Sequence, residues 1–224
     1  MEIVTLYVGQ GGLAVARNAG EAIFVDSCLP GDEAHRERII AQLDRTMRNQ
    51  AAAGLMLTGF DSDHCNPDGV ELILSRYKPR WVMYPTYYKD TDCAADSFKI
   101  IDKHVARRES TGNPLKRVSV RVDKVQSRAL SGLSNAFGFE LFSPHIEDMD
   151  HSNNSSIVVK LTSGGPGGFS YLITGDTETG RWERISQLFG DALRADVLDA
   201  PHHGSKTGMH AGALLNISPH TVLI

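Results

Sequence analysis

The 224-residue sequence has few cysteines, no long apolar run and no excess of positive charge. Cys28, Cys65 and Cys93 are scattered and odd in number, which excludes a disulfide framework and favours a reducing compartment. No apolar stretch approaches the roughly 18 residues of a membrane helix, and no basic segment marks a signal peptide. A formal net charge of −4 gives no general attraction to nucleic acid or anionic membrane. We therefore expect a soluble, cytoplasmic protein without membrane association.

Local patterning predicts an α/β (α+β) chain. Apolar and β-branched runs predict strands at 2–8, 51–57, 81–85, 118–122, 137–144, 155–161, 169–176, 196–200 and 221–224, and a strand pair within 13–27. Helical spacing predicts helices at 32–50, 69–77, 94–108 and 181–193. Two strand-rich halves with helices predict two sheets packed face to face with helices outside, in one domain over 1–224. Because the chain ends on the apolar segment TVLI, we expect truncation at the C-terminus.

Polar side chains follow several of the predicted strands. They are Asp61, Asp63 and His64 in LTGFDSDHCNPDG, then His151, Asn153 and Asn154, then Asp176, and finally His202 and His203. Carboxylates and imidazoles together suit Zn²⁺, Mn²⁺ or Fe²⁺. A metal-bound water that loses its proton near neutral pH can serve as the nucleophile, so this chemistry requires no serine or cysteine.

Five short motifs occur in the same order as in a known protein family. LTGFDSDHCNPDG resembles the first motif of the metallo-β-lactamase superfamily, in the Ser-His-Pro-Asp-x-Asp-His form of the ComEC-type competence-protein hydrolase domain. YVGQGG, NNSSIVVKL, YLITGDTE and ADVLDAPHHGSKTG resemble further motifs of that subgroup. The resemblance implies an αββα metallo-β-lactamase-like sandwich with a metal site along one edge.

The resemblance also implies roles for individual residues. Asp61, Asp63, His64, Asp176 and one of His202 or His203 would be metal ligands, and Asp63, Asp176 and Lys206 would be catalytic. Asp26 would orient the ligand loop from behind. Asn153 would occupy the region where other members place a histidine, and His151 beside it could substitute for the ligand missing at Gly59. Ser205 and Thr207 would contact a substrate phosphate together with Lys206.

The sequence departs from the motifs of the family at several positions, among them HCNPDG in place of the usual His-x-Gly-Gly. Gly59 stands where the first histidine belongs, Gly12 replaces an aspartate, and Phe60 replaces a proline. Glycine cannot ligate a metal, so the first-metal site loses one ligand. The remaining residues predict one divalent ion, Zn²⁺ or Mn²⁺, rather than two.

Each motif also has a simpler interpretation. Residues 61–64 could be an acidic turn that caps the helix near Gly69, and Asp176 could cap the helix after it. His151 fits a surface loop, and Cys65 a small buried hydrophobic residue. Residues 204–208, GSKTG, lack the earlier glycine of a nucleotide P-loop and could be a polar turn.

A local excess of basic residues contrasts with the acidic chain. It comprises Lys103, Arg107, Arg108, Lys116, Arg117, Arg121, Lys124 and Arg128. The run could follow a phosphate backbone, or it could be a solvated helix face and a strand edge protected by charge. No aromatic residues interleave it, which argues against stacking of single-stranded bases.

Three hypotheses for function follow. The first is a metal-dependent hydrolase, specifically a phosphodiesterase or nuclease acting through a metal-bound hydroxide on nucleic acid or a small phosphodiester. The second is a degenerate binding or sensing module without catalysis, with a partner protein as one ligand. The third is a lactonase, thioesterase or β-lactamase, which the carboxylate-rich first motif disfavours.

Overall fold

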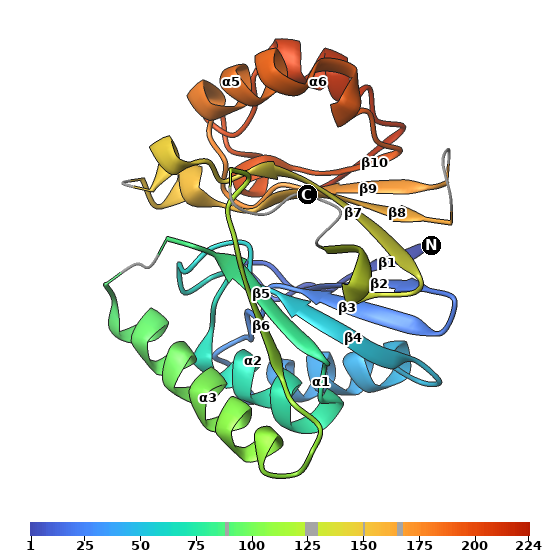
Figure 1. Ribbon diagram of the computed structural model, residues 1–224, viewed down its shortest axis with the longest axis vertical. Coiled ribbons are helices and arrows are strands. Elements are labelled where there is room, and N and C mark those ends of the chain that lie inside the picture. The colour runs from blue at the N-terminus through green and yellow to red at the C-terminus, as the bar shows by residue number, and fades with distance from the viewer. Residues whose placement is uncertain (88–89, 124–129, 150, 165–167) are drawn as a thin grey trace. The chain divides into compact units, whose positions relative to one another are not determined.

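The computed structural model describes residues 1–87, 90–123, 130–149, 151–164 and 168–224 (Figure 1). The chain folds into two compact units. The N-terminal unit comprises Glu2–Tyr84 and Tyr88–Ser119, and the C-terminal unit comprises Met1, Pro85–Tyr87 and Val120–Ile224. Each unit is described by itself below, and the single domain expected from the sequence stays a prediction.

The N-terminal unit contains a six-stranded sheet with its strands in chain order. The strands are β1 (Glu2–Thr5), β2 (Ala14–Asn18), β3 (Glu21–Val25), β4 (Ala51–Met56), β5 (Trp81–Pro85) and β6 (Lys116–Val120). β1, β2 and β3 pair antiparallel, whereas β3, β4 and β5 pair parallel. Parallel strands end at the same edge of a sheet, so the residues after β3 and after β4 emerge side by side.

Helices cover one face of this sheet (Figure 1). They are α1 (Glu33–Thr46), α2 (Pro67–Leu72), which continues as the π-helical turn η1 (Ile73–Tyr77), and α3 (Asp92–Glu109). Asp32 caps α1 by accepting a hydrogen bond from the backbone N–H of His35 at 2.7 Å, as its position before the helical pattern predicts. The predicted helix over 69–77 therefore begins two residues earlier and ends in a π-helical turn.

The C-terminal unit contains a five-stranded sheet in the order β11-β10-β9-β8-β7. The strands are β7 (Phe137–Ser143), β8 (Val158–Ser163), β9 (Ser170–Ile173), β10 (Val197–Asp199) and β11 (Thr221–Leu223). β8 and β9 form the predicted antiparallel hairpin, and β9 and β10 run parallel. The residues that follow β9 and β10 consequently reach the same edge of this sheet.

A buried cluster joins this sheet to α5 (Thr179–Phe189) and α6 (Ala211–Ile217). Phe142, Leu172 and Trp182 are completely buried in it. The Trp182 indole N–H donates to the carbonyl of Thr177 at 3.2 Å, which satisfies its polar atom within the core. The sequence patterning did not predict α6, and the predicted helix over 181–193 divides into α5 and the 3₁₀ turn η5 (Gly190–Leu193).

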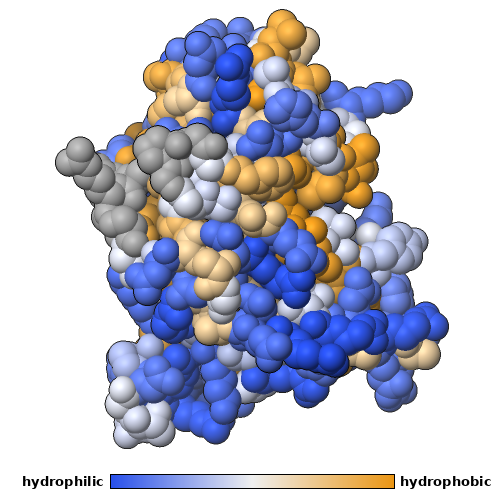
Figure 2. All heavy atoms as spheres, turned by 90° about the vertical axis from the view of Figure 1, so that its right-hand side faces the viewer, coloured by the Kyte–Doolittle hydropathy of each residue, from blue (hydrophilic) through white to orange (hydrophobic). Residues whose placement is uncertain are grey.

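Hydrophobic side chains are exposed on the C-terminal unit. Leu188, Leu214 and Leu215 of α5 and α6 expose 50%, 41% and 80% of their surface, and hydrophobic atoms are visible near these helices in Figure 2. Among the described residues, no helix is both long enough and apolar enough to cross a membrane.

Candidate metal centre

The loop 57–66 follows β4 and is held from behind by Asp26, the residue that follows β3. One carboxylate oxygen of Asp26 accepts a hydrogen bond from the Thr58 backbone N–H at 2.7 Å. The other lies 2.8 Å from Nδ1 of His64. Asp26 and His64 are both buried. A proton on Nδ1 that is donated to Asp26 leaves the lone pair of the imidazole on Nε2, which is the tautomer of a metal-ligating histidine.

Backbone hydrogen bonds tie the same loop to two distant segments. The Gly12 N–H donates to the carbonyl of Asp63 at 2.8 Å, and the Ser27 N–H donates to the carbonyl of His64 at 2.9 Å. A Cβ atom added at Gly12 would lie 2.8 Å from a carboxylate oxygen of Asp26. The glycine that replaces the expected aspartate at position 12 is therefore required by the close approach of Asp26.

Phe60 replaces the proline of the motif and anchors the loop in the core. It is 2% exposed, and its ring lies 5.2 Å from that of Phe98 and 6.2 Å from that of Tyr84. The aromatic contacts hold the backbone of the loop without the conformational restriction of proline.

The end of the loop starts α2. Asn66, not an acidic residue, caps this helix by accepting a hydrogen bond from Gly69 N–H at 3.2 Å. Asp61 accepts the backbone N–H groups of His64 and Cys65 with its own carbonyl at 3.0 and 2.8 Å. Cys65 is completely buried, and burial raises the pKa of its thiol to about 12, which fits a small hydrophobic residue.

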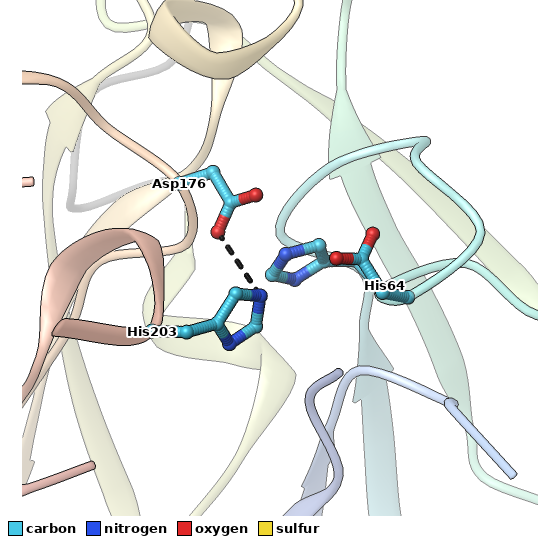
Figure 3. Close-up of side chains that lie close together, drawn as sticks. His64, Asp176 and His203 are labelled. Carbon is cyan, nitrogen blue, oxygen red and sulfur yellow. Dashed lines mark ion pairs between the residues drawn. The ribbon is translucent and has the colours of Figure 1, made fainter. Parts of the chain in front are cut away.

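In the C-terminal unit, Asp176 follows β9 and His203 follows β10. Nε2 of His203 lies 3.5 Å from a carboxylate oxygen of Asp176, the contact drawn as a dashed line in Figure 3. The Asp176 backbone N–H donates to the Ser156 hydroxyl at 3.1 Å. Asp176 does not cap α5, because the N-cap residue of that helix is Glu178.

The neighbouring His202 faces a residue for which the sequence motifs predicted no role. Its Nδ1 lies 3.8 Å from a Glu178 carboxylate oxygen, which also accepts a hydrogen bond from the Asn153 side chain at 3.0 Å. Asn153 and His202 are thus linked through Glu178. Glu178 is the last residue of the motif YLITGDTE and directly precedes α5, but no role was expected for it.

Asp26 and the two histidines after β10 adopt the left-handed backbone conformation, which is uncommon for residues other than glycine. Asp26, His202 and His203 have φ angles of 60°, 50° and 52°. The His202 N–H donates to the carbonyl of Gly175 at 3.0 Å, which fixes the turn after β10 against the turn after β9. Strained backbone of this kind is concentrated at functional sites in proteins.

The residues expected to contact substrate follow this turn directly. Ser205, Lys206 and Thr207 are all exposed, and the hydroxyls of Ser205 and Thr207 lie 3.2 Å apart. The carbonyl of Thr207 accepts the backbone N–H of Thr179 at 2.7 Å, so the first turn of α5 supports the segment. His151 is exposed in a loop, where its carbonyl accepts the N–H of Ser155 at 2.9 Å.

The candidate ligand set comprises two side chains of each unit, each pair described by itself: Asp63 and His64 in the N-terminal unit, and Asp176 and His203 in the C-terminal unit. Two carboxylates and two imidazoles match the ligand chemistry of Zn²⁺ and Mn²⁺. The Asp26–His64 pair also provides the carboxylate support that metal-ligating histidines have. The residues present therefore fit a divalent ion. Asp61 and His202, also expected as ligands, are outside this set.

Two curated proteins are similar to the chain in sequence, and no family model matches it. It is 29% identical over 170 residues to ComE operon protein 3 of Bacillus subtilis. The aligned residues cover 76% of this chain and 19% of that protein. It is 27% identical over 209 residues to the uncharacterized protein YcaI of Escherichia coli. That alignment covers 92% of this chain and 22% of that protein. The chain thus spans about a fifth of the length of these relatives.

Solved structures show the same fold. A structure of the E377D mutant of the CmlA beta-hydroxylase matches 99% of this chain and 45% of its own, with a TM-score of 0.55 and 15% identity. A protein of Parabacteroides distasonis assigned as a metal-dependent hydrolase matches 98% of this chain and 80% of its own, with a TM-score of 0.53 and 14% identity. The chain shares its fold with these two structures. The fold class and the resemblance to ComEC-type hydrolase domains expected from the motifs are confirmed.

Proposed function

We propose that this chain is a metal-dependent phosphodiesterase that binds one divalent ion, Zn²⁺ or Mn²⁺, with Asp63, His64, Asp176 and His203 as its candidate ligands. The observation that supports this most directly is the contact of 2.8 Å between Asp26 and Nδ1 of His64. It places the lone pair of this buried histidine on Nε2, which is the tautomer that a metal ligand requires. When bound, the ion supplies Lewis-acid activation of water and of a phosphoryl oxygen.

The chain's own residues then bind and orient the substrate. Lys206 is exposed on the segment that follows His203, so its ammonium group can pair with a phosphate oxygen. The hydroxyls of Ser205 and Thr207 supply further donors to the same phosphate. A phosphodiester is the substrate class that this combination of cation and hydroxyl donors favours, either in nucleic acid or in a small molecule.

Elemental analysis of the purified protein tests the metal site first. We expect one equivalent of zinc or manganese per chain in the wild type and much less in Asp176→Asn. Asp191→Asn, which changes an exposed aspartate of the same unit, should keep its metal. A metal content near zero in the wild type, unchanged on adding Zn²⁺ or Mn²⁺, contradicts the site.

Hydrolysis of bis(p-nitrophenyl) phosphate with the same metals tests the activity. Lys206→Ala should lower kcat/KM about tenfold or more, since a charge-assisted hydrogen bond contributes roughly 1.5–3 kcal/mol. Its metal content should not change. Lys99→Ala, in which the exposed partner of Asp96 is removed, is the matched control.

A second function, a binding module without catalysis, is favoured by Gly59, which stands where the motif has its first histidine. Gly59→His restores the histidine of the motif and separates the two proposals. Activity that appears only in this variant would assign the natural chain to the binding class. Activity in the wild type supports the phosphodiesterase.

A further inference from the structure

The basic run between Lys103 and Arg128 does not form one continuous track. Three of its members face carboxylates: Lys103 pairs with Glu71, Arg117 with Asp102 and Arg121 with Asp123. Lys116 lies on the edge strand β6, and Lys124 and Arg128 lie outside the described residues. Arg107 and Arg108, in the last turn of α3, remain to be explained.

Arg107 and Arg108 line a cavity of about 240 Å³ in the N-terminal unit, together with Lys78 at the end of η1. Among the residues that the structure describes, no carboxylate lines this cavity. Within the described part of the chain, none of these three cations forms an ion pair with a carboxylate. Glu71 of α2 is instead bound by Lys103 and by His104, a further lining residue.

Arg108 is a buried cation held by neutral groups. It is 8% exposed and donates to the backbone carbonyls of Pro79 and Asn113. Burial lowers the pKa of its guanidinium from the ordinary value. A buried guanidinium stays protonated in proteins, so the wall of the cavity carries a positive charge that these carbonyls do not neutralise.

Lys78 reaches the cavity from a different element and in an unfavourable backbone conformation. It ends η1 in the left-handed region with φ of 54°, a position usually occupied by glycine or asparagine. The two arginines alone could be explained by their favourable interaction with the C-terminal dipole of α3. That explanation does not extend to a strained lysine on η1 that faces the same cavity.

Hydroxyl and amide groups complete the lining. Ser75, Thr111 and Asn113 contribute polar side chains. The hydroxyls of Ser75 and Thr111 donate to helix carbonyls at 3.3 and 3.0 Å and can rotate toward a ligand oxygen. The cavity therefore combines cations with hydrogen-bond donors, as phosphate sites do.

The cavity is remote from the ligand loop of the same unit. Ser97, on α3, donates to the carbonyl of Cys65 in that loop at 3.3 Å, whereas Arg108 is eleven residues further along the helix. At 1.5 Å per residue this separates the two places by about 16 Å, too far for a single phosphate to contact both.

We propose that the cavity lined by Lys78, Arg107 and Arg108 is a second anion site, which binds the phosphate group of a small ligand. The phosphate oxygens accept hydrogen bonds from the three cations, and no bond is made or broken. The site does not depend on the metal or on the proposed phosphodiesterase activity.

Calorimetric titration of chelator-treated protein at constant ionic strength tests the site without any metal–phosphate contact. The probes are inorganic phosphate, a nucleoside 5′-monophosphate, and acetate as the anion control. The test variant combines Lys78→Asn, which tolerates the left-handed backbone, with Arg107→Gln. The control combines Lys99→Asn with Arg117→Gln, which removes two cations that pair with carboxylates.

Binding of either phosphate compound to the wild type, weakened at least tenfold in the test variant but not in the control, supports the site. The tighter of the two compounds then identifies whether the phosphate is free or carried on a nucleoside. No binding of either compound overturns the proposal. Equal binding of acetate, or equal weakening in both double variants, also overturns it, because the interaction is then general charge attraction.

Discussion

The carboxylate of Asp26 lies 2.8 Å from Nδ1 of His64, and both residues are buried. Asp26→Asn would place an amide N–H₂ group opposite Nδ1. Nδ1 would then have to accept a hydrogen bond from that group, and the imidazole proton would move to Nε2. We expect metal affinity to fall about 10–100-fold, as losses of such supporting carboxylates do. Asparagine tolerates the left-handed backbone at position 26.

Equilibrium dialysis with Zn²⁺ or Mn²⁺ measures the effect of Asp26→Asn, with the melting temperature recorded in parallel. Asp44→Asn is the control, because this carboxylate pairs with Arg76 on an exposed surface. Unchanged affinity in Asp26→Asn would show that Asp26 does not support a ligand.

Gly12→Ala tests the close packing behind the loop. The added methyl group would meet the Asp26 carboxylate at 2.8 Å, so we expect a loss of about 1–3 kcal/mol in the free energy of unfolding. Metal affinity should fall as well, because Asp26 must move. Gly31→Ala has open space around its Cβ and should leave urea unfolding almost unchanged. A stable Gly12→Ala protein would refute the requirement for glycine.

Much of the fold was predictable because strand and helix patterns are local. The strand pair β2–β3, helix α1 and the hairpin β8–β9 follow directly from turn residues and apolar spacing. By contrast, the sequence pattern did not predict α6, and it did not indicate that α2 continues as a π-helical turn. These features depend on what the segments pack against.

The candidate site shows the same division. Asp63, His64, Asp176 and His203 stand in ordered motifs, so the sequence could name them as candidate ligands, and their role as ligands stays a prediction. The contacts of Glu178 with Asn153 and His202 could not be predicted, since they arise only when three separate segments fold together. Likewise, a sequence departure such as Gly12 is explained only by the position of Asp26.

Leu172→Ala tests the core of the C-terminal unit. Leu172 is completely buried beside Trp182, so removing its side-chain atoms should cost about 2–5 kcal/mol of unfolding free energy. Leu215→Ala, at a position 80% exposed, should change stability by less than about 0.5 kcal/mol. Denaturant unfolding measures both, and similar values for the two variants would contradict the described core.

Asp196 should make stability depend on pH in the acid range. The hydroxyl and backbone N–H of Ser170 donate to it at 2.8 Å each, and these bonds lower its pKa below the ordinary 3.8. A lowered folded-state pKa contributes stability above the unfolded-state value and loses it as pH falls through the folded-state value. The stability difference between wild type and Asp196→Asn should therefore be largest near neutral pH and shrink below pH 3.8.

Thermal unfolding of wild type and Asp196→Asn between pH 2 and 7 measures this dependence. Asp191→Asn, an exposed substitution nearby in sequence, serves as the comparison. A difference between wild type and Asp196→Asn that stays constant over the whole range would contradict the role of the Ser170 hydrogen bonds.

The contact between Asp26 and His64 joins residues 38 positions apart. Contacts at such separations form only after the intervening chain has closed, so they appear slowly and together with the parallel pairing of β3 and β4. During refolding, metal affinity should consequently appear with the native sheet and not before it. A short synthetic peptide containing the loop would have the same ligands in the same order but would lack the carboxylate that sets the imidazole tautomer.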